Sequence, residues 1–312
     1  MAPSQINKKK KAIIFGCQQI AVDLIDFLLK KNVEIPLVVT YELPLDQTYG
    51  YASVIEFCKN RNLNFFAGDR ITDSMTDWIS EQKPDFIFSF YYRKILPKSL
   101  LAIAKDRAIN IHPSLLPHYR GPVPTAWAIE NGEKEVGVTI HLMDGGIDTG
   151  DILIQKRYPI GENETGYELY TRAMTLGTDL FRKNYDKIAS GKIKPYKQEG
   201  VGSYYGKKSG RYILDWKRKA EDIRNLIRVY AKPFNMAETK LFNRYVLVNR
   251  AKVLKDKKYP AQGAGRIMDI LPGEKLLVSC ADGCLLLEDY QFAPKLTPQE
   301  KKIYLKIGNR FE

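Results

Sequence analysis

The chain has 312 residues and is 44% hydrophobic, which suits one large domain or two unequal ones and excludes a disordered protein. None of its apolar runs reaches the roughly 20 residues of a membrane-spanning helix, so we expect no membrane partner. The net charge of +13 fits either a solvated lysine-rich surface or an anionic partner, such as RNA or a phosphorylated small molecule.

The N-terminus and the cysteines favour a cytoplasmic protein. The basic start, MAPSQINKKKK, is followed by a stretch with polar and acidic interruptions and no small-residue cleavage site, which is unlike a signal peptide. The four cysteines match no zinc-binding spacing, and a reducing compartment would keep them as thiols. We therefore expect a cytoplasmic protein without a metal.

The first 190 residues alternate between strand and helix patterns. Apolar runs predict strands at 11–15, 36–40, 63–67, 84–92 and 107–112, followed by two more at 136–144 and 150–160. Amphipathic stretches predict helices at 18–30, 49–62, 73–82, 98–104 and 165–190. This alternation predicts an α/β fold with a doubly wound, mainly parallel sheet, in which ligands bind beyond the carboxyl ends of the strands.

The pattern changes after about residue 190. Residues 191–212 are polar, glycine-rich and basic, and they read as a linker. A helix is predicted near 219–231, followed by short strands at 243–253, 265–270, 275–280 and 284–290. We therefore predict three parts: an N-terminal catalytic domain at 1–190, a linker at 191–212 and a smaller β-barrel-like domain at 213–312.

The run from Asn110 to Asp151 carries the strongest chemical signal. It places a carboxamide (Asn110), an imidazole (His112) and a carboxylate (Asp148) in one segment rich in glycine and proline. An amide N–H can stabilise an oxyanion, an imidazole can move a proton, and a carboxylate can orient the imidazole and favour its charged form. Together they are the groups that acyl transfer to an amine needs.

Each of these residues also has a purely structural interpretation. A lone histidine is more often structural, and an aspartate in a glycine turn can simply close that turn. Asn110 and His112 lie two apart, however, so their side chains share one side of an extended segment, and Pro113 keeps His112 out of a helix.

Other readings of the chain are weaker. The histidines and aspartates have no metal-ligand spacing, and GCQQIA after the first strand lacks the glycines of a dinucleotide site. There is neither a P-loop nor a G-x-S-x-G motif. The aromatic run FSFYYR at 88–93 is interpreted as the core of a strand, with a stacking platform for bases as the alternative.

The motif order resembles that of the folate-dependent N-formyltransferases. Their pattern is Asn-x-His, SLLP-x-YRG, a tryptophan, G-V-T-x-H and a late Asp in a glycine turn. This chain has Asn110-Ile-His112, Ser114 to Gly121, Trp127, Gly137 to His141 and Asp148. The resemblance covers nearly the whole chain and implies N10-formyltetrahydrofolate as the formyl donor. It also implies a small C-terminal barrel like that of methionyl-tRNA formyltransferase.

The resemblance also implies roles for particular residues. His112 would be the acid/base, Asn110 would stabilise the transition state, and Asp148 would raise the pKa of His112. The implied folate contacts are Lys94, Ile95, Leu96, Asp144, Gly145, Gly146, Ile147 and Asp148.

Within the family, the chain is most similar to the domain that formylates UDP-4-amino-4-deoxy-L-arabinose. The similarity lies in the stretches at 48–51, 88–93 and 204–216. One departure is Pro122, where that enzyme has an arginine directly after its YRG. A nucleotide-linked 4-amino sugar is therefore the expected acceptor, while the particular sugar, the nucleotide and any homo-oligomer stay open.

Two alternatives are a methionyl-tRNA formyltransferase and a folate-binding regulatory protein without transfer activity. A tRNA enzyme of this family carries a basic loop after the second strand. Here residues 41–51 contain two acids and no lysine or arginine, which favours the sugar because phosphate-backbone binding needs cations. Intact Asn110, His112 and Asp148 argue against the regulatory protein.

Overall fold

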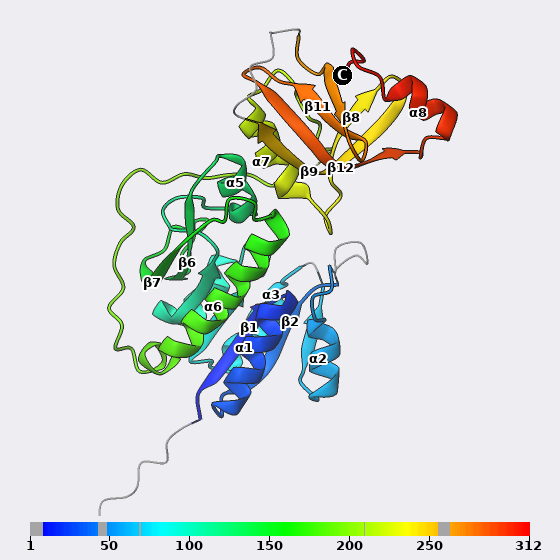
Figure 1. Ribbon diagram of the computed structural model, residues 1–312. Coiled ribbons are helices and arrows are strands. Elements are labelled where there is room, and N and C mark those ends of the chain that lie inside the picture. The colour runs from blue at the N-terminus through cyan, green and yellow to red at the C-terminus, as the bar shows by residue number, and fades with distance from the viewer. Residues whose placement is uncertain (1–8, 43–48, 69, 209, 255–262) are drawn as a thin grey trace, which may run out of the picture. The chain divides into compact units, whose positions relative to one another are not determined.

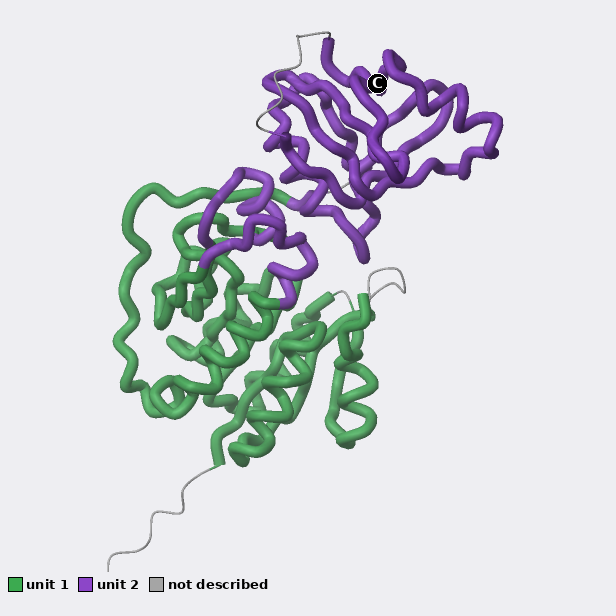
Figure 2. The backbone as a smooth tube through the Cα atoms, in the orientation of Figure 1, with its two compact units in different colours: residues 1–124, 136–158, 172–206 green, residues 125–135, 159–171, 207–312 purple. Residues whose placement is uncertain are grey.

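The computed structural model describes residues 9–42, 49–68, 70–208, 210–254 and 263–312 (Figure 1). These residues fall into two compact units, shown in different colours in Figure 2. The first unit takes the described residues up to 124 together with 136–158 and 172–206. The second takes 125–135, 159–171 and the described residues from 207 onward. Over the described chain, no helix is both long and apolar enough to cross a bilayer.

The first unit is built on a seven-stranded sheet with the order β3-β2-β1-β4-β5-β6-β7. Its strands are β1 (Lys11–Gly16), β2 (Glu34–Thr40), β3 (Phe65–Ala67), β4 (Phe86–Phe90), β5 (Ala108–His112), β6 (Glu135–Leu142) and β7 (Ile152–Pro159). Pairing is parallel from β3 to β5 and turns antiparallel between β5 and β6. The predicted mainly parallel sheet is therefore confirmed.

Helices cover both faces of this sheet. They are α1 (Gln18–Lys30), α2 (Val54–Asn60), α3 (Asp73–Glu81), α4 (Lys98–Ile103), a 3-10 turn (Lys105–Arg107) and the part of α6 (Gly166–Ala189) from residue 172 onward. Helix α5 (Pro124–Glu130) falls in the second unit from residue 125 onward. Helices α1 and α6 lie side by side (Figure 1), and the rings of Phe27 and Tyr185 join them at 5.6 Å. On the other face, Ile79 of α3 and Leu100 of α4 pack against Phe15 of β1. The sheet is thus doubly wound, as predicted.

The aromatic run on β4 forms core. Phe86, Phe88 and Phe90 are fully buried and stack along one face of the sheet at 5.1 and 5.6 Å. Phe181 of α6 meets Phe88 and Phe90 edge-on at 5.2 and 5.4 Å. This packing confirms the interpretation of residues 88–90 as the core of a strand.

Phe88→Ala is expected to lower the free energy of unfolding by about 3–5 kcal/mol, because it removes a fully buried ring and leaves a cavity. Urea unfolding of the two proteins measures the loss. The control is Phe66→Ala on β3, where the ring is 37% exposed and the loss should be about 1 kcal/mol or less. Equal losses in the two variants would contradict this account of the core.

The second unit contains α7 (Ala220–Tyr230), α8 (Pro298–Tyr304) and a five-stranded antiparallel sheet of order β10-β11-β12-β9-β8. The strands are β8 (Ala237–Leu241), β9 (Arg244–Leu254), β10 (Ile267–Leu271), β11 (Lys275–Ser279) and β12 (Cys284–Ala293). The last residues bridge both edges, since Phe311 pairs with Leu241 and Arg310 pairs with Arg266 beside β10. This closure gives the predicted barrel-like form.

The sequence pattern does not predict α5, β8 or α8. Helices α5 and α8 have seven residues each, which is too short for a 3.6-residue period to stand out. Strand β8, AETKL, has only two apolar residues and joins the sheet through backbone pairing with β9. Context from the tertiary structure, rather than local pattern, decides these elements.

Candidate active site

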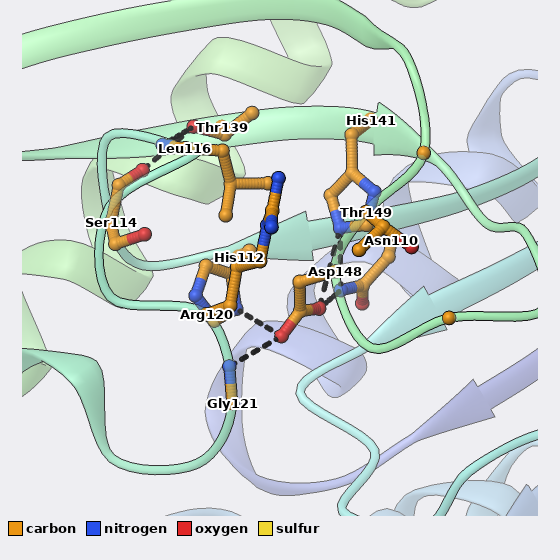
Figure 3. Close-up of polar contacts among 12 residues, drawn as sticks. Asn110, His112, Ser114, Leu116, Arg120, Gly121, Thr139, His141, Asp148 and Thr149 are labelled. Atoms are coloured by element: carbon orange, nitrogen blue, oxygen red, sulfur yellow. Dashed lines mark hydrogen bonds and ion pairs between the residues drawn. The ribbon is translucent and has the colours of Figure 1, made fainter. Parts of the chain in front are cut away.

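The site lies where β5 ends and the loop between β6 and β7 begins. Antiparallel pairing sets Asn110 opposite His141 and His112 opposite Thr139, so the side chains of Asn110, His112 and His141 share one face of the sheet. The β6–β7 loop then brings Asp148 to these three residues (Figure 3). The structure therefore brings together the three predicted residues Asn110, His112 and Asp148, and adds His141.

The carboxylate of Asp148 is the centre of the cluster. Its Oδ2 accepts a hydrogen bond from the Gly121 N–H at 2.8 Å and lies 3.5 Å from Nδ1 of His112 (Figure 3). Its Oδ1 accepts from Nδ2 of Asn110 at 3.4 Å and lies 3.5 Å from Nε2 of His141. One side chain thus contacts groups from β5, from β6 and from the loop after β5.

Both ring nitrogens of His112 face acceptors. Nε2 donates to the carbonyl oxygen of Tyr119 at 2.8 Å, and Nδ1 faces the carboxylate of Asp148. Only an imidazole with a proton on each nitrogen can donate to both groups. These two partners therefore favour the protonated form of His112.

Burial and charge oppose each other at His112. Burial, the largest effect, lowers the pKa of His112, and the nearby His141 lowers it further. Asp148 and the Tyr119 carbonyl act to raise it. On balance, the pKa of His112 lies below the ordinary histidine value. At Asp148, burial acts to raise the pKa, but His112, His141 and the Gly121 N–H more than offset it and leave the pKa well below its usual range. Asp148 is thus ionised at neutral pH, and the balance at His112 is shifted toward the neutral imidazole.

These shifts predict a loss of stability in acid. Each group has a folded pKa below its unfolded one, so its contribution is present above the unfolded pKa and disappears as the pH falls through the folded pKa. The unfolded values are about 6.5 for histidine and about 3.9 for aspartate. The free energy of unfolding should therefore decline below about pH 6.5, first through His112 and then through Asp148.

Urea unfolding between pH 7.5 and pH 5 measures this decline. The slope should be shallower in His112→Ala, which lacks the first titrating group, and unchanged in His118→Ala, whose residue is exposed. A parent-like slope in His112→Ala would show that other groups cause the decline.

Three residues beside the site adopt left-handed backbone conformations. These are Tyr119 with φ 59°, Gly121 with φ 91° and Asp148 with φ 52°. At Gly121 an added Cβ would also lie only 2.5 Å from the carbonyl oxygen of Tyr205, so glycine is required there. Tyrosine adopts this conformation at a cost, which the surrounding structure must offset.

The predicted folate-contact residues lie on two neighbouring segments. In the 144–148 loop, Asp144 closes the turn by accepting from Gly146 N at 2.9 Å and from Thr149 Oγ1 at 2.7 Å. An added Cβ on Gly145 would meet the side chain of Lys98, so the loop lies beside the start of α4.

On the other segment, the three predicted residues differ in exposure. Lys94 is exposed and Ile95 is 72% exposed, whereas the side chain of Leu96 packs in the core with α4. Residues 94–95 and 144–147 are thus exposed, whereas the buried side chain of Leu96 is not available to a ligand.

His141 is the residue that the sequence argument leaves out of the site. Its Nε2 lies 3.1 Å from Nδ2 of Asn110, and its Nδ1 donates to the carbonyl oxygen of Leu142 at 2.7 Å. The predicted strand at 136–144 already contains His141, so the sequence indicates that this residue lies in the sheet. That His141 pairs with Asn110 follows only from the register of β5 and β6.

Comparison with known proteins gives consistent results. Residues 10–183 match the family described as formyl transferase, and residues 207–302 match its C-terminal domain. A methionyl-tRNA formyltransferase from Clostridium novyi (strain NT) is 37% identical over 234 residues, covering 74% of this chain and 73% of the relative.

Two solved structures share the fold. One is an N-formyltransferase from Helicobacter canadensis with folinic acid and dTDP-3-aminofucose, at TM-score 0.73 and 24% identity, covering 89% of this chain and 98% of that one. The other is WlaRD, a sugar 3N-formyl transferase with dTDP and 5-N-formyl-THF, at TM-score 0.72 and 25% identity, covering 92% and 99%.

Proposed function

This chain belongs to the formyl transferase family, and we propose that it moves the formyl group of N10-formyltetrahydrofolate to the amine of a nucleotide-linked 4-amino sugar. That it is a formyl-transferring enzyme follows from the family. The observation that carries the proposal is the meeting of Asn110, His112 and Asp148 at the end of β5.

The geometry gives each residue of the cluster a task. When bound, the folate supplies a formyl carbon on N10 that the acceptor amine attacks. The N–H that Asn110 directs at Asp148 makes a long 3.4 Å bond, so it can turn to the formyl oxygen as negative charge develops there. His112 takes the proton that the amine loses and gives it to the departing nitrogen. Asp148 stabilises the imidazolium between these two transfers.

The sugar acceptor rests on similarity and on charge. WlaRD, a sugar 3N-formyl transferase, shares the fold over nearly its whole length. The 41–51 segment, where a tRNA enzyme would be basic, has no cation in its sequence, although residues 43–48 lie outside the described residues. Both points support a small phosphorylated acceptor.

A second candidate is formylation of methionyl-tRNA. The relative at 37% identity carries that name. The charge of the chain is also uneven: residues 207–312 hold 23 Lys and Arg against 12 Asp and Glu, a difference of 11 out of the net +13. Such a concentration of positive charge in one part of the chain is typical of proteins that bind polyanions. It therefore supports a nucleic-acid acceptor more strongly than a nucleotide-sugar acceptor.

An acceptor panel separates the two candidates. The enzyme is incubated with N10-formyltetrahydrofolate and either UDP-, dTDP- or GDP-linked 4-amino sugars or charged initiator methionyl-tRNA, and the product is detected by its formyl mass. We expect a formylated nucleotide sugar. Formyl transfer only to methionyl-tRNA would establish the second candidate, and transfer to neither would reject both.

A further inference from the structure

Residues 196–205, here called the brace, hold both loops of the active site. They lie in the polar, glycine-rich stretch after α6 (Figure 1) and within the 184–206 segment that neither family match includes. Tyr196 pairs with Ile152 at the start of β7, through N–O distances of 2.7 and 3.0 Å. Tyr204 forms a parallel bridge with Arg120. The brace therefore joins the β6–β7 side of the site to the loop after β5.

Gln198 uses every hydrogen-bonding group of its carboxamide in this connection. Its Nε2 donates to the carbonyl oxygens of Asp148 and Gly150, both at 2.8 Å. Its Oε1 accepts from Nε and Nη2 of Arg120, at 3.1 and 2.7 Å. Gln198 is half-buried, whereas its neighbours Lys197 and Glu199 are exposed. A surface linker would not need such a saturated amide.

The brace also supports the second partner of His112. The N–H of Tyr119 donates to Oγ of Ser203 at 2.9 Å, and the rings of Tyr119 and Tyr205 stack at 5.0 Å. The carbonyl of Tyr119 in turn accepts from His112. The two left-handed residues that flank His112, Tyr119 and Asp148, are thus both bonded to the brace, which offsets the cost of their conformation.

We propose that Gln198 is a positioning residue that sets the carboxylate of Asp148 against His112. It touches neither His112 nor the Asp148 carboxylate. It fixes the backbone on which that carboxylate stands and ties this backbone to the Arg120 loop, which supplies the Gly121 N–H. The expected effect of Gln198 on turnover rests on the proposed function, whereas its expected effect on the pKa of His112 does not.

The test uses Gln198→Ala and Gln198→Glu in the full chain, with Lys197→Ala as the matched control on the same segment. Glutamate keeps the shape of the side chain and the contact to Arg120, but it cannot donate to the carbonyls of Asp148 and Gly150. The glutamate variant therefore tests the proposal even if the alanine variant does not fold. Turnover should fall about 10- to 100-fold in both, with KM changed little, because the loss is one of orientation.

The second readout is the pKa of His112, followed through its imidazole C–H signals in NMR. The chain has only three histidines, so His118→Ala and His141→Gln assign the signals. The charged and titratable groups that act on His112 are Asp148 from the β6–β7 loop and His141 from β6. Since Asp148 raises the pKa of His112, a displaced carboxylate should let that pKa fall further in both Gln198 variants and not in Lys197→Ala.

A parent-like His112 pKa and turnover in Gln198→Glu would overturn the proposal. If the parent enzyme formylates none of the acceptors, the proposed function fails, yet the NMR comparison still decides the role of Gln198. A fall in turnover together with an unchanged His112 pKa would also reject this role, because it would place the effect of Gln198 elsewhere.

Discussion

His112→Ala should lower turnover by about 10²- to 10⁴-fold, because it removes the group that carries the proton from the attacking amine to the departing nitrogen. The side chain is buried at the end of β5, where it bonds to the Tyr119 carbonyl and lies 3.5 Å from the Asp148 carboxylate. Steady-state kinetics with the accepted amino sugar measures the loss, and circular dichroism verifies folding.

The matched control is His118→Ala, a histidine six residues along the same loop. Its side chain is exposed, so the substitution should leave turnover within about 2-fold of the parent. A folded His112→Ala protein with near-parental turnover would remove His112 from the mechanism. Equal losses in the two variants would point to the loop rather than to the imidazole.

Asp148→Asn should also lower turnover, by about 10²- to 10⁴-fold, through the loss of charge alone. Asparagine tolerates the left-handed conformation of this position, and its side-chain oxygen can still accept from the Gly121 N–H. The backbone and the loop should therefore stay in place. What disappears is the negative charge that raises the pKa of His112.

The sign of the accompanying pH effect follows from that charge. Without it, the pKa of His112 falls further below the ordinary histidine value, so the acid limb of kcat/KM should move to lower pH. Residual kcat/KM across pH 5 to 8 measures the shift, and Asp106→Asn is the control, since Asp106 is an exposed aspartate on the 3-10 turn before β5. An acid limb that stays in place, or moves to higher pH, would contradict the ion pair between Asp148 and His112.

Local pattern was sufficient for most of the first unit. Buried parallel strands are continuous apolar runs, so the strands around Phe88 and Ile111 could be predicted from composition alone. Asn110 and His112 could also be placed together, because their two-residue spacing holds in any extended segment.

The rest of the site depends on pairings that composition does not encode. His141 reaches Asn110 through the antiparallel register of β5 and β6. Gln198 reaches Asp148 across 50 residues of chain, in a segment whose glycines and lysines resemble any solvated linker. The polar side chains of His141 and Gln198 make hydrogen bonds to distant parts of the chain. A hydrophobic periodicity in the sequence predicts helices and strands, but it does not predict such partners.

The barrel of the second unit is completed by its own final residues. The Asn309 carbonyl accepts from the Ile267 N–H and the Phe311 N–H donates to the Gly265 carbonyl, while the Glu312 N–H donates to the Lys240 carbonyl on the opposite border. Deleting these few positions would leave two rows of unsatisfied amides and carbonyls, which are templates for intermolecular pairing and aggregation.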